Sequence, residues 1–224
     1  MLFWGLKLLV IGPLLRLLLR PRVTGAAHIP ATGPVILAGN HLSFIDPLAL
    51  AALARRRVHF LAASTYYVKR GFAGRFVGLF LTYTGMKPID RAGGSASEAS
   101  LRAGLEVLSN GRVLGIYPEG SRSRDGRLHR GRTGVARLAL LSGAPVVPVA
   151  MVGTAEVIPV HSRSVLPRIR RIEMRVGAPL IPERREDLTD GAALRAFTDR
   201  IMAALAELGG QEYVDEYTNA RRDG

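Results

Sequence analysis

PVILAGNHLSFIDPLALAAL, residues 34–53, joins an apolar run, a polar turn and a run rich in Ala and Leu. The first run, residues 34–38, is bounded by glycines and predicts a buried strand. Residues 47–55 predict a helix. His41 and Asp46 stand in the turn between the two elements. The stretch therefore predicts a strand, turn and helix of an α/β fold, with a titratable imidazole and a carboxylate where the strand ends.

Two interpretations of Asp46 fit this spacing. Asp46 followed by Pro47 is the pattern of a helix N-cap with proline at the first helical position. Alternatively, the carboxylate could accept a hydrogen bond from one imidazole nitrogen of His41, fix the tautomer and leave the other nitrogen free as a base. On one continuous helix, residues five apart lie about 140° from each other, so this pairing requires a turn. Spacing alone leaves both interpretations open.

The rest of the chain alternates between the two kinds of element. We expect further strands at residues 23–25, 58–62, 86–89, 112–117, 145–151 and 168–176. We expect further helices at residues 131–142 and 192–208, and a third between the capping box of residues 95–98 and Asn110. Residues 155–167 are expected as loop, and residues 71–84 as a helix that is buried or faces a membrane. The pattern predicts one α/β domain, residues 22–208, with a mixed, largely parallel central sheet flanked by helices.

The two ends differ from this domain. Residues 1–21 form the most lipophilic stretch, but Lys7, Pro13 and Arg16 interrupt it and disfavour a single membrane span. Aromatic residues near one end and arginines near the other favour an apolar helix that lies in the headgroup region, with packing on the domain as the alternative. Residues 209–224 are expected to be a polar, disordered tail.

The amino-acid composition limits the classes of ligand and partner that this chain can bind. The 31 Lys and Arg residues against 18 Asp and Glu give a net charge of +13, so the surface suits polyanions: nucleic acid, an anionic membrane or phosphorylated substrates. No cysteine is present, which excludes disulfides, thiolate metal sites and a cysteine nucleophile. The five histidines lack metal-ligand spacing, and we expect no metal site.

Polar or cationic residues follow three of the expected strands. These are His41 with Asp46, Asp90 with Arg91, and Glu119 with Arg122. Ligands gather at strand ends in sheets of this kind, so the convergence predicts a site.

Four blocks resemble the glycerolipid acyltransferases, the family that includes the 1-acylglycerol-3-phosphate (lysophosphatidate) acyltransferases. The blocks occur in order: Asn40-His41 with Asp46, residues 85–91 (GMKPIDR), residues 117–122 (YPEGSR) and residues 144–149 (APVVPV). One block alone is weak, but four in sequence are specific. Tyr117 and Ser121 replace the family's usual Phe and Thr. Arg132 lies near the position where members of the family often have a lysine.

The resemblance implies acyl transfer from a thioester to an alcohol, most simply from an acyl-coenzyme A or acyl carrier protein to 1-acylglycerol-3-phosphate, without a cofactor. His41 would be the base and Asp46 its orienting partner, while Arg91 and Arg122 would bind the acceptor phosphate. Glu119 would hold one of these arginines or contact the acceptor hydroxyl, and Gly120 would let the backbone turn closely around the ligand. Asn40, Ser121 and Pro148 would support the site. The enzyme would work at the cytoplasmic face of the cell membrane as a peripheral or monotopic protein.

Other functions remain open at this point. The charge alone suits a nucleic-acid-binding protein, but aromatic residues make up only 6% of the chain and RNA-binding signatures are missing, so we expect no nucleic-acid partner. A non-catalytic lipid-binding protein would not need His41 and Asp46. Among enzymes, acylation of glycerol 3-phosphate, another lyso-lipid or a glycolipid is the alternative.

Overall fold

A computed structural model describes residues 9, 12–63, 87–89, 96–157, 168–185, 187, 188 and 190–218. This part of the chain forms a seven-stranded sheet in the order β1-β8-β7-β2-β5-β3-β4. Its strands are β1 Arg22–Thr24, β2 Val35–Gly39, β3 Val58–Ala63, β4 Lys87–Ile89, β5 Val113–Ile116, β7 Val146–Val152 and β8 Glu173–Val176. Neighbouring strands are parallel except β7 and β8, which are antiparallel. The predicted mixed, largely parallel sheet is confirmed.

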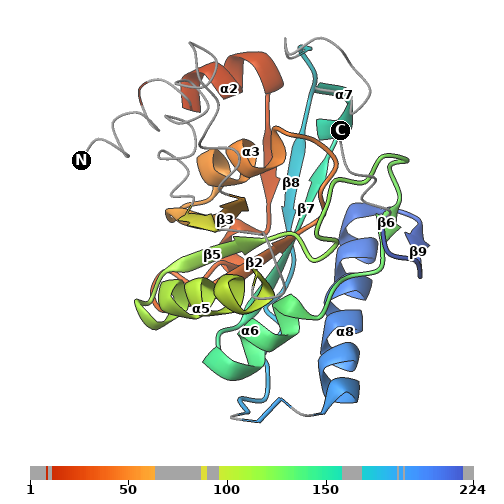
Figure 1. The fold of residues 1–224 in the computed structure, drawn as a ribbon. Coiled ribbons are helices and arrows are strands. Elements are labelled where there is room, and N and C mark those ends of the chain that lie inside the picture. Colours follow the sequence, from red (N-terminus) through yellow and green to blue (C-terminus); the bar gives the residue numbers. More distant parts are fainter. Residues whose placement is uncertain are drawn as a thin grey trace.

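Helices cover both faces of the sheet (Figure 1). They are α2 Gly12–Leu19, α3 Asp46–Leu53, α5 Ala96–Ser109, α6 Gly134–Ser142, α7 Thr154–Val157 and α8 Gly191–Gly209, with a short 3-10 helix, η2, at Ala26–His28. Helices α2 and α3 pack into one apolar cluster, while α5, α6 and α8 pack into a second. Strand β2 lies between the clusters, since its Leu37 belongs to the first and its Ile36 to the second. Burial on both faces explains why β2 is a continuous apolar run rather than an alternating one.

The sheet brings two distant segments to one edge. Ala38 of β2 pairs with Ile116 of β5, and Gly39 pairs with Val149 of β7. Because these strands are parallel, the chain leaves β2 and β5 at the same edge of the sheet. The segment after β2 contains His41, and the segment after β5 contains Glu119.

The N-terminal segment is described chiefly through α2. This helix packs against α3 and buries Leu19 completely, whereas Leu9 and Leu17 are 79% and 73% exposed. Within the described residues, no helix is both long enough and apolar enough to cross a membrane. Residues 1–8, 10 and 11 of the expected apolar helix lie outside the described part.

The connecting segments differ from expectation in two places. Residues 155–157, expected as loop, belong to α7, a helix of four residues that is too short for a periodic sequence pattern. The strand expected from residue 168 begins only at Glu173. Residues 71–84, residues 158–167 and Ser95 of the capping box lie outside the described residues.

The expectation of a disordered tail is wrong as far as residue 218. Gly210 ends α8 in the left-handed conformation with φ of 66°, and the chain turns back toward the site. Strand β9, Tyr213–Val214, then pairs in parallel with β6, Leu128–His129 (Figure 1). The tail acquires structure because it finds a partner strand that is distant in sequence.

Candidate active site

His41 and Asp46 meet across the turn that joins β2 to α3. His41 Nδ1 lies 3.0 Å from Asp46 Oδ2. The same oxygen accepts the backbone N–H groups of Leu42 and Ser43, each at 2.7 Å. Asp46 makes no side-chain cap to α3, whose N-cap is Ile45. Of the two interpretations of Asp46, the structure therefore shows the partner of the imidazole.

This geometry fixes the tautomer of His41. Asp46 Oδ2 already accepts two N–H donors, so Nδ1 must donate to it and Nε2 is left with a lone pair. None of the described residues hydrogen-bonds Nε2, and the imidazole side chain is 17% exposed while Asp46 is fully buried. An oriented imidazole with one accessible nitrogen can accept a proton from a substrate hydroxyl.

Tyr117, which follows β5, stacks on the imidazole. The ring centroids of His41 and Tyr117 are 4.2 Å apart with an angle of 19° between the planes, and Phe60 of β3 stacks behind Tyr117 at 6.0 Å. Burial raises the pKa of the Tyr117 phenol well above its ordinary value, and the negative charge of Asp46 raises it further. The Tyr117 side chain therefore stays un-ionised, and its ring packs on the imidazole and fixes the plane of the His41 ring.

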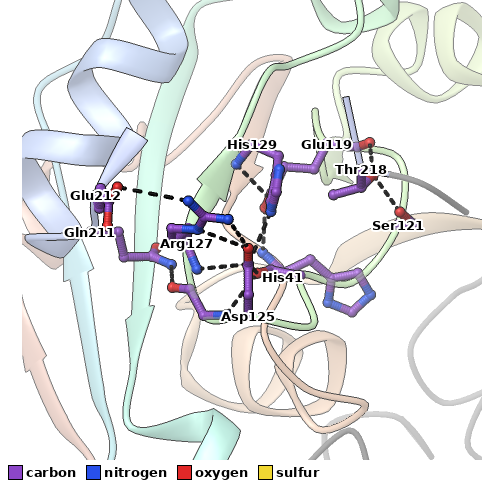
Figure 2. A network of polar contacts seen from close by, with 11 residues as sticks. His41, Glu119, Ser121, Asp125, Arg127, His129, Gln211, Glu212 and Thr218 are labelled. Atoms are coloured by element: carbon purple, nitrogen blue, oxygen red, sulfur yellow. Dashed lines mark hydrogen bonds and ion pairs between the residues drawn. The ribbon is translucent and has the colours of Figure 1, made fainter. Parts of the chain in front are cut away.

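Glu119 contacts the backbone rather than Arg122, one of the two arginines that the sequence suggested. Its Oε1 accepts the N–H of His41 at 3.1 Å and its Oε2 accepts the N–H of His129 at 3.0 Å (Figure 2). No ion pair joins Glu119 to Arg122 in the described chain, so the interpretation that it holds Arg122 is wrong. Glu119 is 1% exposed, and this burial raises its pKa to about 7 even though both N–H contacts and His129 act to lower it. The buried carboxyl group fixes the main chain on either side of the loop.

Arg122 lies on the same loop as Glu119. The next residue, Ser123, donates its N–H to the carbonyl of His41 at 2.7 Å, which places this turn beside the main chain of His41. The guanidinium carbon of Arg122 lies 4.7 Å from the centre of the Phe44 ring. Arg91, the second expected phosphate ligand, lies outside the described residues.

The expected supporting residues are brought to the same region. Asn40 is fully buried and exchanges two hydrogen bonds with the backbone of Met151 on β7, at 2.7 and 3.0 Å. Pro148 lies in the interior of the same strand. These contacts fix the end of β2 against β7 immediately before His41.

The two small residues of the loop have different functions. Gly120 has φ of 80°, and a Cβ there would lie 3.0 Å from Nε of Arg132, so the turn requires glycine. Ser121 Oγ lies 2.6 Å from Oγ1 of Thr218.

Sequence reasoning missed several members of this network. His129 supplies an N–H to Glu119 and its Nε2 lies 2.9 Å from Asp125 Oδ1. Gln211 and Thr218 reach the site from the expected tail (Figure 2). The available signal was charge: the segment 211–218 is acidic and the segment 122–132 is rich in arginine.

Comparisons with known proteins fit this geometry. Residues 20–152 match the family model described as Acyltransferase. The chain is 28% identical over 146 residues to the chloroplastic 1-acyl-sn-glycerol-3-phosphate acyltransferase BAT2 of Brassica napus, covering 64% of this chain and 40% of that protein. It is 31% identical over 135 residues to the 1-acyl-sn-glycerol-3-phosphate acyltransferase of Borreliella burgdorferi, covering 59% of this chain and 51% of the relative.

A solved structure shares the fold. The 1-acyl-sn-glycerophosphate acyltransferase PlsC from Thermotoga maritima superposes with a TM-score of 0.66 at 23% identity, over 92% of this chain and 79% of that one. The matched segment spans about half or less of the two curated relatives' length.

Proposed function

Because the chain belongs to the acyltransferase family, whose model matches residues 20–152, we propose that it transfers a fatty acyl group from an acyl thioester to the hydroxyl of a phosphorylated glycerolipid. The acceptor we propose is 1-acylglycerol-3-phosphate, which gives phosphatidic acid, because both named relatives are 1-acyl-sn-glycerol-3-phosphate acyltransferases. The observation that carries the proposal is the contact of 3.0 Å between His41 Nδ1 and the buried Asp46 Oδ2. This contact leaves Nε2 of His41 free to act as the base.

In the proposed reaction, His41 Nε2 removes the proton of the acceptor hydroxyl as its oxygen attacks the thioester carbonyl. The tetrahedral intermediate then expels the thiolate, and the proton on Nε2 passes to the leaving sulfur. An oxygen ester and a free thiol result, and the imidazole returns to its starting state. Proton transfer by a positioned base such as His41 contributes about 10² to 10⁴ in rate. Asp46 holds the ring and stabilises the imidazolium.

The acceptor phosphate is proposed to bind Arg122 together with Arg91. A guanidinium group presents a fork of donors that matches two phosphate oxygens, which a lysine cannot reproduce. Arg122 is supported by Phe44 and lies one residue from the Ser123 contact to His41. The phosphate would thus be fixed near the base, with the free hydroxyl of the glycerol directed at Nε2.

The donor is a substrate rather than a cofactor in this proposal. Either acyl-coenzyme A or an acyl carrier protein is acidic and would suit the net charge of +13. The chemistry at His41 needs neither a metal nor an organic cofactor.

We place the reaction at the cytoplasmic face of an anionic membrane. Leu9 and Leu17 are exposed on the N-terminal segment, and Ile169 is 64% exposed between arginines at positions 168, 170 and 171. A backbone hydrogen bond from the N–H of Ile172 to the carbonyl of Leu19, at 3.1 Å, joins the two segments. Apolar side chains flanked by arginines favour insertion into the headgroup region, where both the acceptor and the product reside.

An assay of purified protein in detergent tests the function. We expect palmitoyl-coenzyme A and 1-acylglycerol-3-phosphate to give phosphatidic acid and free coenzyme A in equal amounts. His41→Ala should abolish turnover while its circular dichroism spectrum stays that of the wild type. His28→Ala, which removes an imidazole bonded to the carbonyl of Val176, serves as the control and should keep turnover. Substantial turnover by folded His41→Ala protein would contradict the mechanism.

A further inference from the structure

The segment of residues 211–218, here called the C-terminal segment, lies along the loop that follows Glu119. Strand β9 pairs with β6, and the backbone N–H groups of Leu128 and Arg130 donate to the carbonyls of Glu212 and Glu216. Arg130 also lies 3.5 Å from the carboxylate of Asp215. The family match ends at residue 152, well before this segment. The C-terminal segment is therefore attached to the site loop along its length, although it lies outside the matched blocks.

At the far end of the C-terminal segment, the hydroxyl of Thr218 contacts the loop. Thr218 Oγ1 donates to the backbone carbonyl of Glu119 at 3.4 Å, and Ser121 Oγ lies 2.6 Å from the same atom (Figure 2). Since a threonine hydroxyl has one proton, Ser121 is the donor in the second contact. A hydrogen-bonded chain thus joins Ser121, Thr218 and the main chain of Glu119.

The near end contacts the residue before His41. Gln211 Oε1 accepts a hydrogen bond from Nδ2 of Asn40, and Gln211 Nε2 donates to the carbonyl of Gly126 at 2.8 Å. Asn40 is fully buried and its other amide proton goes to Met151. Without Gln211, one buried N–H of Asn40 would lose its partner, a costly loss in the interior.

We propose that Gln211 and Thr218 are positioning residues for His41, an inference that rests on the proposed function. The backbone of His41 is held from one side by Glu119 and Ser123, whose loop Thr218 supports. From the other side it follows Asn40, which Gln211 supports. The C-terminal segment thus fixes both ends of the main chain that carries the base, without touching the imidazole.

A pair of substitutions at Thr218 tests this function. Thr218→Val keeps the shape but removes the hydroxyl, whereas Thr218→Ser keeps the hydroxyl. We expect kcat of Thr218→Val to fall about tenfold with the donor KM within about twofold, because a small misplacement of a catalytic group lowers rate more than binding. Thr218→Ser should stay within about twofold of the wild type. Gln211→Leu should resemble Thr218→Val.

Tyr213→Phe is the matched control. It also removes one hydroxyl from the C-terminal segment, but that hydroxyl donates to the exposed Asp215 at 3.3 Å. We expect its kcat to match the wild type. Wild-type kcat in both Thr218→Val and Gln211→Leu would overturn the proposal, as would an equal loss in Thr218→Ser, which would show that the hydroxyl is not responsible.

Amide hydrogen exchange gives a measurement that does not depend on turnover. The N–H of His41 donates to Glu119, and the N–H of Ser123 donates to His41, so these two amides report on the position of the base. We expect both to exchange several-fold faster in Thr218→Val than in Tyr213→Phe. If the wild-type protein shows no acyl transfer, the proposed function is overturned but the positioning of His41 can still be tested by amide exchange. Unchanged exchange rates of the His41 and Ser123 amides in Thr218→Val would overturn the positioning function.

Discussion

The carboxyl group of Glu119 accepts the backbone N–H of His41 at 3.1 Å, so the loop after β5 holds the main chain of the base directly. The other carboxyl oxygen accepts the N–H of His129. Two N–H donors favour the ionised carboxylate, while burial in a nearly solvent-free position disfavours it. The effect of burial is the larger of the two, so the pKa of Glu119 rises from 4.5 to about 7.

This raised pKa predicts a stability that depends on pH. The folded chain binds the Glu119 proton more tightly than the unfolded chain does, so the associated stability is fully present below about pH 4.5 and is lost as the pH rises through about 7. We expect the free energy of unfolding of the wild type, relative to Glu119→Gln, to fall by about 3 kcal/mol over this interval. Urea unfolding at several pH values measures the difference. Parallel pH curves for the two proteins would contradict the prediction.

The strands and their shared edge could be predicted because each has a strong local signal. Residues 34–38 are apolar without interruption and are followed by Gly39, and β2 indeed ends there. Likewise, the expected helix of residues 192–208 is α8, with Phe197 and Ile201 buried at helical spacing. Long helices and strands with one apolar face contain enough residues for the periodic spacing of apolar positions to be recognised in the sequence.

The partners within the site could not be predicted from the same signals. Strands β6 and β9 have two residues each, too few for any periodicity. The side-chain contact of Gln211 with the carbonyl of Gly126, next to these strands, joins positions 85 apart. Glu119 was expected to hold Arg91 or Arg122, or to contact the acceptor hydroxyl, but its two oxygens accept the backbone N–H groups of His41 and His129. Unpaired backbone donors in the interior are too costly to leave, and sequence does not show which donors a fold will bury.

The second prediction concerns the orienting carboxylate. Asp46→Asn can keep an acceptor oxygen for the three hydrogen bonds that reach Oδ2, but it removes the negative charge that stabilises the imidazolium. An amide turned the other way would present its NH2 group to Nδ1, and the ring would then adopt the wrong tautomer. We expect kcat to fall about 10² to 10³-fold, less completely than for His41→Ala. Asp199→Asn, at an exposed ion pair with Arg195 on α8, is the control and should leave kcat unchanged in the same assay. An Asp46→Asn enzyme with wild-type kcat would remove Asp46 from the mechanism.

The third prediction concerns membrane binding. Deleting residues 1–20 would also remove the buried Leu19 from the core, so point substitutions are the sharper test. We expect Leu9→Gln with Leu17→Gln to lower the affinity for anionic vesicles at least about tenfold, because each exposed leucine loses its apolar transfer free energy. Ile181→Gln, at a site that is 67% exposed on another segment, is the control. Sedimentation with vesicles containing phosphatidylglycerol measures the bound fraction. Full sedimentation of the double variant would place the membrane contact elsewhere.

The last prediction concerns the acceptor phosphate. Two functions fit Arg122: its guanidinium could bind phosphate, or its contact of 4.7 Å with Phe44 could merely stabilise the loop. Lysine keeps the charge and much of the cation–π contact but lacks the fork of donors. If Arg122 binds the phosphate, Arg122→Lys should weaken acceptor use by roughly 1.5 to 3 kcal/mol, mainly in the acceptor KM, with little change in the donor KM.

Comparing two acceptors separates these functions. Lysophosphatidate carries the phosphate and monoacylglycerol does not, so the wild type should prefer the first and Arg122→Lys should lose much of that preference. Arg112→Lys, an exposed arginine just before β5, is the control, because the N-terminal ends of the parallel strands lie at the edge away from His41. A loss of activity in Arg122→Lys that is equal for both acceptors would assign Arg122 to support of the loop. Equal use of both acceptors by the wild type would show that the enzyme does not recognise the phosphate group of the acceptor.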